Sequence, residues 1–298
     1  MTKGFTLLAI GQKEYGYWAR NMAASIKANS DVQIQLIHDG KATKHLHFDE
    51  PFGNQYLFDT ITDIPADLYT DNGHFSPGKA KIHLYDLMAF DHSIYLDVDG
   101  CCIGDVSGLF DICTKPIVSH VWGYGTLQDK TFGDLMYWAD AEPLWQHFHI
   151  PADARLPFLN TSFISVRKGN EAEMIYRTAQ QCLDNPMPLA AMRELWGKGN
   201  QPDELYFNTA MALLNYEPHI EGFNPIYFRP YREYGAAVPL DTIKQQHYFI
   251  GLWGGQRFNH QSVERYYDGV MRNVWSQVGQ TNVHKTGNLM RKKFVETN

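Results

Sequence analysis

The feature that most constrains this chain is a pair of aspartates at the end of a short apolar run. Residues 94–98 read as a buried strand, because strand-forming residues lead directly into Asp97, Val98 and Asp99. Unpaired carboxylates are almost never buried, so both aspartates are expected where the strand leaves the sheet. Residues two apart in an extended chain share a side, and α/β sheets bind ligands at carboxyl strand ends. The pair predicts an oxygen-rich site for Mg²⁺ or Mn²⁺ and substrate phosphates, with a solvated strand exit as the alternative.

Apolar periodicity elsewhere predicts a chain that alternates strands and helices. Residues 5–10 read as a strand, 15–29 as an amphipathic helix and 32–37 as a second strand, which together form a β-α-β unit. Neither a Gly-x-Gly-x-x-Gly fingerprint nor a Walker pattern follows the first strand. Residues 41–75 are expected to be mostly loop. The other expected elements are strands at 117–121, 160–167 and 247–251, helices near 171–184, 189–196 and from 202 onward, and an irregular aromatic segment at 122–157.

A helix that starts at Ser76 carries two lysines near its beginning. Ser76 suits the N-cap and Pro77 the first turn, and Lys79 and Lys81 follow. The lysines are two residues apart, so about 200° of helix rotation separates them and only one can face a given ligand. A cation near a helix N-terminus is mildly unfavourable, and a bound phosphate would offset that cost. Surface lysines that solvate the helix are the alternative.

Composition narrows the class of protein. The 298 residues carry a formal net charge of −7, which argues against nucleic-acid binding. No apolar run approaches the roughly 20 residues of a membrane span, and the first residues lack a signal-peptide apolar region, so a cytoplasmic location is expected. No Cys-x-x-Cys pair occurs, and all four cysteines are interpreted as reduced packing residues. They are Cys101, Cys102, Cys113 and Cys182.

Taken in order, these segments resemble glycosyltransferases of the GT-A fold, most closely family 8, from residue 5 to about residue 251. The motifs that carry the resemblance are Tyr95-Leu96-Asp97-Val98-Asp99 with Gly104-Asp105, Asn160-Thr161-Ser162, Asp203-Glu204 with Asn208, and His247 with Gly251. The chain departs from the family pattern at four positions. Ser162 replaces a glycine, Glu204 a glutamine and Leu205 a second aspartate, and the element at His247 has one extra residue and no lysine-proline pair.

The resemblance implies an α/β fold with a central mixed, mainly parallel sheet flanked by helices. It also implies metal-dependent transfer of a hexose from a nucleotide-sugar, expected to be a UDP-sugar, to a glycan, a lipid-linked acceptor or another hydroxyl acceptor, with retention. The implied cofactor is Mn²⁺ or Mg²⁺, with Asp97, Asp99 and His247 as its ligands. The implied catalytic residues are Asp203, Glu204 and Asn160, and the implied nucleotide-binding residues are Ala9, Tyr15, Lys79, Lys81, Asp97 and Val98.

Some assignments within this resemblance stay open. Glu204 is a nucleophile, a ligand of a sugar hydroxyl or a helix-start charge, and the last two are favoured. Asp203 and Asn160 are expected to hold the donor sugar rather than the nucleotide.

The resemblance also sets expected domain boundaries. Residues 1–283 form one GT-A-like domain, with a nucleotide-binding half at about 1–121, an acceptor half at about 122–260 and a C-terminal helix at about 261–277. Residues 284–298 form a basic tail. The tail is either a peripheral anchor for anionic membranes or a solvated terminus, and the solvated terminus is favoured because the whole chain is acidic.

Two other functions fit parts of the same sequence. A haloacid-dehalogenase-like phosphatase would use Asp97 as a phospho-aspartate and Asp99 as the acid and base. That nucleophile loop normally follows the first strand, whereas a complete β-α-β unit precedes it here. The second alternative is a non-catalytic sugar-binding protein, which the loss of a carboxylate at Leu205 and of the late lysine favours.

Overall fold

The computed structural model of the chain describes residues 1–46, 57–71, 74–128, 139–188, 191–192, 202–228, 239–251 and 269–276. The described strands are β1 (Lys3–Ala9), β2 (Gln33–His38), β3 (Thr60–Asp63), β4 (Thr70–Asp71), β5 (His74–Phe75), β6 (His92–Leu96), β7 (Gly100–Cys102), β8 (Ile117–Gly125), β9 (Leu156–Arg167), β10 (Ile226–Phe228) and β11 (Phe249–Gly251). The described helices are α1 (Lys13–Asn29), α2 (Pro77–Ile82), α3 (Leu84–Leu87), α4 (Leu109–Ile112), α6 (Ala141–Phe148), α7 (Asn170–Asp184), α8 (Asp203–Leu213) and α9 (Leu240–Lys244), with short 3₁₀ turns η1 (Lys44–Leu46) and η3 (Ala66–Leu68).

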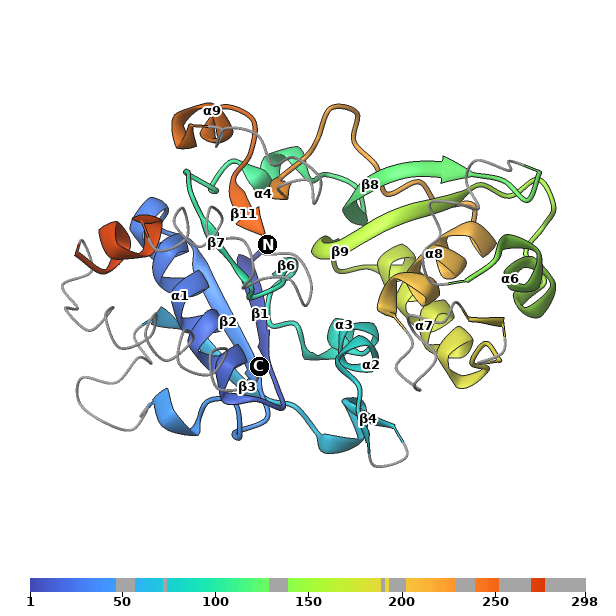
Figure 1. Ribbon diagram of the computed structural model, residues 1–298, viewed down its shortest axis with the longest axis horizontal. Helices are drawn as coiled ribbons and strands as arrows, with labels where there is room; N and C mark the ends of the chain where they lie inside the picture. The colour runs from blue at the N-terminus through green and yellow to red at the C-terminus, as the bar shows by residue number, and fades with distance from the viewer. Residues whose placement is uncertain are drawn as a thin grey trace, which may run out of the picture. The chain divides into compact units, whose positions relative to one another are not determined.

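The fold is mixed α/β, as the sequence predicts, with a six-stranded, mainly parallel sheet flanked by helices (Figure 1). Its strand order is β3-β2-β1-β6-β9-β8, and two smaller sheets have the orders β10-β11-β7 and β4-β5. None of the helices in the described ranges combines the length and apolar character needed to cross a bilayer.

The described residues form two compact units, and the chain passes between them several times. Unit 1 comprises Met1–Lys3, Ile64–Tyr95 and the described residues from Cys113 to Phe223. Unit 2 comprises the described residues of Gly4–Asp63, then Leu96–Ile112 and those described from Asn224 onward. The predicted division near residue 121 does not follow these boundaries. The single domain over residues 1–283 stays a prediction.

The nucleus of unit 2 is a set of parallel strands with a helix between the first two. β1 pairs in parallel with β2, from Gly4 opposite Gln33 to Ala9 opposite His38. The apolar run of β1 is buried almost throughout, as expected for a parallel strand that is covered on both faces. α1 packs against β7, where the Ser25 hydroxyl accepts a hydrogen bond from the Cys102 backbone N–H at 2.8 Å. The predicted β-α-β unit is therefore confirmed.

The expectation that residues 41–75 are mostly loop is wrong for three short strands. β3 forms the edge of the large sheet and pairs in parallel with β2. Its four residues alternate between half-buried and exposed, and Ile61 is exposed. No apolar periodicity therefore marks this strand in the sequence, and its pairing with β2 defines it.

Unit 1 is built on a long antiparallel pair with helices packed against it. β8 pairs with β9, and the register shifts twice along the pair. α8 packs against both β9 and α7, and Figure 1 shows it beside α7. The fully buried rings of Tyr176 and Phe207 meet edge to face between the two helices, with centroids 5.1 Å apart. The irregular segment expected at 122–157 instead contains the end of β8, the start of β9 and the helix α6.

The helix predicted from Ser76 onward is shorter than expected. Ser76 occupies the N-cap position of α2 and Pro77 its first turn, but the Ser76 side chain makes no capping hydrogen bond. The helix ends at Ile82, and a separate single-turn helix, α3, follows after His83. Most of the predicted helix at 189–196, residues 261–268 of the predicted C-terminal helix and the tail at 284–298 lie outside the described residues. Residues 269–276 are helical.

The four cysteines are all free and buried, as predicted. Burial raises the pKa of the Cys102 thiol to about 12 and that of the Cys182 thiol to about 11. Both thiols therefore stay protonated and pack as small apolar groups.

Gly100 is expected to be essential for pairing between β7 and β11. A Cβ at this position would overlap the backbone carbonyl oxygen of Ile250, which belongs to β11 and cannot move aside like a side chain. Gly100→Ala should therefore lower the free energy of unfolding by on the order of 2 kcal/mol. Gly104→Ala is the matched control, because an added Cβ there meets nothing within 4 Å. Equal melting temperatures of the two variants in thermal unfolding would contradict this close approach.

Candidate functional site

Asp97 and Asp99 lie where the sequence predicts them, directly after a buried strand. All five residues of β6 are buried, and the strand ends at Leu96. Val98 is buried, whereas Asp97 and Asp99 on either side of it are half-buried. Val98 and Asp99 form a bend directly after the strand, so both carboxylates lie where the chain leaves the sheet and is partly open to solvent. The pair therefore stands at the carboxyl end of a strand of an α/β sheet, where ligands commonly bind.

The pairing of β7 with β11 separates His247 from these aspartates. The register places Gly251 opposite Gly100 and Phe249 opposite Cys102, and the Ile103 N–H continues the ladder to the Tyr248 carbonyl at 2.9 Å. At about 3.4 Å per residue, His247 and Asp99 lie at opposite ends of this pair, on the order of 15 Å apart. Among the described residues, no three His, Cys, Asp or Glu side chains are grouped to hold a metal ion. The structure therefore does not bring the three predicted ligands together.

The chemistry of His247 nevertheless suits a ligand. Its Nδ1 lies 3.0 Å from the backbone carbonyl oxygen of Asn224, so the N–H at Nδ1 donates and Nε2 keeps a lone pair. Burial lowers the pKa of the imidazole, which favours this neutral form. His247 therefore has the neutral form that a metal ligand needs, but it lies far from Asp99.

Asp203 is the first residue of α8 and is held by Lys81. Its side chain is almost buried, and Lys81 Nζ lies 3.4 Å from its Oδ2. Lys81 Nζ also lies 5.5 Å from the centre of the Tyr95 ring, which favours the cation further. The exposed fractions of the two side chains are 12% and 11%, so little water screens the pair. The structure brings together two residues that the sequence assigns to different tasks, nucleotide binding and sugar binding.

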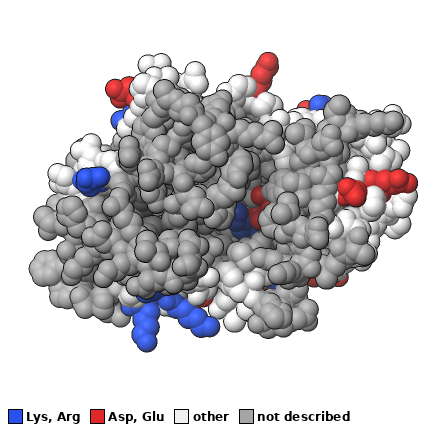
Figure 2. All heavy atoms as spheres, in the orientation of Figure 1, with Lys and Arg blue, Asp and Glu red and all other residues white. Residues whose placement is uncertain are grey.

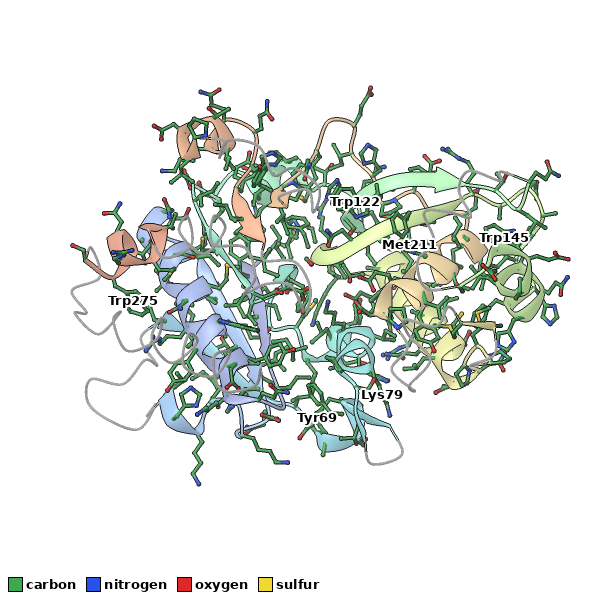
Figure 3. The ribbon with its side chains drawn as sticks, in the orientation of Figure 1. Tyr69, Lys79, Trp122, Trp145, Met211 and Trp275 are labelled. Atoms are coloured by element: carbon green, nitrogen blue, oxygen red, sulfur yellow. The ribbon has the colours of Figure 1, made fainter. Side chains whose placement is uncertain are left out.

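Lys79 has a different partner. Its Nζ donates to the backbone carbonyl oxygen of Thr70 in β4 at 2.9 Å (labelled in Figure 3). The two lysines therefore face different groups, as the helical spacing predicts.

Asn160 lies beside a bulge in β9. The register between β8 and β9 shifts between Ser119 and His120, and Asn160 is paired with His120. The Asn160 side-chain oxygen accepts the N–H of Ser162 at 2.9 Å. The preceding peptide is also fixed, because the Leu159 N–H donates to the side-chain oxygen of buried Asn208 at 3.3 Å. α8 therefore supplies Asp203 and, through Asn208, positions the backbone next to Asn160.

The departures from the family pattern have visible causes in α8. Leu205 is fully buried in unit 1, where a carboxylate would lose its hydration. Glu204, about 100° further round the helix than Asp203, is half-buried.

The residues predicted at the first strand lie at its carboxyl end or in the helix that follows. Ala9 is the last residue of β1 and is fully buried, and Tyr15 packs edge to face on Trp18 with ring centres 5.4 Å apart. Sequence analysis missed Asp39, which follows β2. One carboxylate oxygen of Asp39 accepts the Gly11 N–H at 2.7 Å and the other accepts the Ala42 N–H at 2.9 Å. The signal available was an acidic residue directly after the second parallel strand.

On the face drawn in Figure 2, the charged residues that the structure describes are of both signs. Described lysines and arginines appear there in separate places, with aspartates and glutamates among them.

Removing Lys81 should cost more stability than removing Lys79. Lys81→Met leaves the nearly buried carboxylate of Asp203 without its cation, a loss on the order of 3 kcal/mol. Lys79→Met removes one hydrogen bond to a carbonyl and should cost about 1 kcal/mol. Urea unfolding of the two variants measures the difference. Adding Asp203→Asn to Lys81→Met should recover part of the loss, and strictly additive losses would contradict the pairing.

Neither a protein-family model nor a curated protein matches the chain by sequence. Among solved structures, the chain is similar to the apo structure of the bifunctional glycosyltransferase WbbM, with a TM-score of 0.57 and 13% sequence identity. The match covers 96% of this chain and 51% of that chain, so this chain spans about half the length of its solved neighbour. At this identity the likeness establishes the fold alone, a mixed α/β fold that this chain shares with part of WbbM.

Proposed function

We propose that this chain is a metal-dependent glycosyltransferase that moves a hexose from a UDP-sugar to a glycan or another hydroxyl acceptor, with retention. The observation that carries the proposal is the Asp97-Val98-Asp99 segment at the carboxyl end of β6, in a chain with the fold of a glycosyltransferase. Membership of family 8 is part of the proposal and rests on the ordered motifs of the sequence.

The carboxylates of Asp97 and Asp99 suit a hard divalent ion. Two partly exposed carboxylates directly after one strand offer the oxygen ligands that Mn²⁺ and Mg²⁺ prefer. Such an ion, when bound, offsets the charge that develops on the pyrophosphate leaving group. The separation of His247 from Asp99 leaves Asp97 and Asp99 as the proposed ligands from the described residues.

The nucleotide is proposed to lie at the carboxyl ends of β1 and β6. Ala9 and Tyr15 bracket the loop after β1, and Asp39 holds that loop through the Gly11 N–H. Val98, which lies between the two aspartates, is proposed to contact the nucleotide through its backbone.

In unit 1, Asp203 and Asn160 are proposed to hold the donor sugar. Lys81 holds the Asp203 carboxylate in place, so we assign Lys81 to this task in place of the nucleotide contact that the sequence indicates. Lys79, bonded to Thr70, stays a candidate for phosphate contact. For Glu204 we propose a contact with a sugar hydroxyl, and no protein nucleophile is assigned.

A non-catalytic sugar-binding protein is the second candidate. Buried Leu205 and remote His247 both remove groups that the family uses, which favours binding without turnover. Donor cleavage separates the candidates. A transferase should slowly hydrolyse a nucleotide-sugar with Mn²⁺, a sugar-binding protein should not, and a phosphatase should instead cleave an aryl phosphate. A thermal-shift screen of nucleotide-sugars with Mn²⁺ would identify the donor, because a ligand of the native state raises its stability.

Two parts of the proposal concern the setting of the reaction. A cytoplasmic location and a lipid-linked or free glycan acceptor are proposed from the sequence alone. Weak membrane contact through residues 284–298 is the less favoured alternative to a solvated tail.

Asp99→Asn should abolish Mn²⁺-dependent binding of UDP and leave the fold intact. The amide keeps the shape of the side chain but loses the charge that binds the ion. Calorimetric titration of UDP with and without Mn²⁺ measures the effect. His247→Ala is the matched comparison, and its Mn²⁺-dependent affinity should stay within about threefold of that of the unmodified chain. Equal losses in both variants would restore the three-ligand set, and undiminished binding by Asp99→Asn would exclude the metal site.

Asp203→Asn should reduce turnover much more than it reduces affinity for UDP. The proposed contact of Asp203 is with the sugar, which UDP lacks, so the loss should appear only with the full donor. We expect kcat for donor hydrolysis to fall at least about a hundredfold, with UDP affinity nearly unchanged. A parallel loss of UDP affinity would place Asp203 at the nucleotide instead.

A further inference from the structure

Trp122 is the exception among the described tryptophans. Trp18, Trp145 and Trp275 are buried, whereas 45% of Trp122 is exposed (Figure 3). Tryptophan has the largest side chain to cover, so an exposed one in a well-packed unit has a cost that calls for an explanation.

The strand itself turns this side chain outward. Along β8, Val121 pairs with Leu159 and Gly123 pairs with Phe158, so Trp122 is an extra residue in the ladder. A bulge of this kind bends the strand and redirects the side chain of the inserted residue. In a regular ladder, every residue of this stretch of β8 would lie opposite a residue of β9. The bulge in β8, rather than poor packing of the surface, therefore accounts for the exposure of Trp122.

The indole has a backing on one side. The His120 ring lies 4.6 Å from the Trp122 ring, at an interplanar angle of 42°, and His120 is nearly buried. His120 is in turn paired across the ladder with Asn160. The indole is thus supported by a nearly buried ring, and that ring belongs to the residue paired with Asn160, which is proposed to contact the donor sugar, all within unit 1.

We propose that Trp122, backed by His120, is a stacking platform for a pyranose ring of the acceptor. The polarised C–H bonds on one face of a pyranose meet the negative face of the indole, while its hydroxyls stay available for hydrogen bonds. The assignment rests on the proposed function, which requires a second sugar or hydroxyl acceptor beside the donor. A protein partner fits less well, because Trp122 is the sole exposed large apolar side chain among the described residues of β8 and β9, and stable protein interfaces need a far wider patch.

The test uses the full chain and simple pyranosides, without donor or metal. Saturation-transfer NMR with the methyl glycosides of glucose, galactose and mannose reports which sugar protons touch the protein. We expect saturable transfer to the protons of one ring face for at least one glycoside. Trp122→Ser should weaken that binding by about tenfold or more, and Trp122→Phe, which keeps an aromatic face, by about threefold.

Met174→Ser is the matched control. Met174 is an exposed apolar side chain of α7 in the same unit, so this variant removes similar surface without touching β8. Its glycoside affinity should equal that of the unmodified chain. No saturable transfer with any of the three glycosides, or equal affinity in Trp122→Ser, would overturn the platform. A dimer in sedimentation that Trp122→Ser dissociates, with glycoside binding unchanged, would reassign Trp122 to a protein interface.

This outcome is independent of the donor measurements. Failure of Mn²⁺-dependent UDP binding would remove the proposed transferase function while leaving a sugar-binding surface in place. Success with UDP and failure with the glycosides would keep the transferase and move the acceptor elsewhere.

Discussion

The cost of burying a carboxylate is the constraint on which both units of this structure depend. At Asp97 and Asp99 it is met because β6 ends at Leu96, so that both aspartates come just after the buried strand. Unit 1 meets it differently, by placing the ammonium group of Lys81 beside the nearly buried carboxylate of Asp203. A charge that is neither hydrated nor paired would destabilise the fold. The aspartates are therefore partly open to solvent in one arrangement and paired with a lysine in the other, and both arrangements leave acidic groups available for binding.

Backbone packing sets a second constraint, which acts through Gly100. β7 and β11 approach so closely at this position that a side chain would meet the Ile250 carbonyl. The same pairing fixes the register, and the register decides which residues of β11 lie near Asp99. Strand packing therefore explains why a glycine directly follows Asp99. The same pairing of β7 with β11 separates His247, which the sequence predicts as a metal ligand, from Asp99.

Irregularities in the antiparallel pair of unit 1 produce its distinctive surface. Two shifts of register between β8 and β9 leave Asn160 beside one bulge and Trp122 in the other. Buried Asn208 stabilises the first of these regions through the Leu159 N–H. Bulges recur next to functional sites because they redirect single side chains without disturbing the rest of the sheet. The placement of Asn160 and Trp122, both proposed to contact sugars, depends on these local departures from regular pairing.

The sequence by itself determined the α/β class, the β-α-β start, the strand that leads into Asp97 and the helix that begins at Asp203. Each of these follows from short-range patterns, namely apolar periodicity, helix-start residues and the exclusion of charge from the core. Tertiary structure alone decided the edge strand β3, the Lys81–Asp203 pair, the loop contacts of Asp39, the place of His247 and the exposure of Trp122. These depend on register and on pairing between distant segments. A one-residue slip turns every side chain of a strand to the other face, and no local pattern records it.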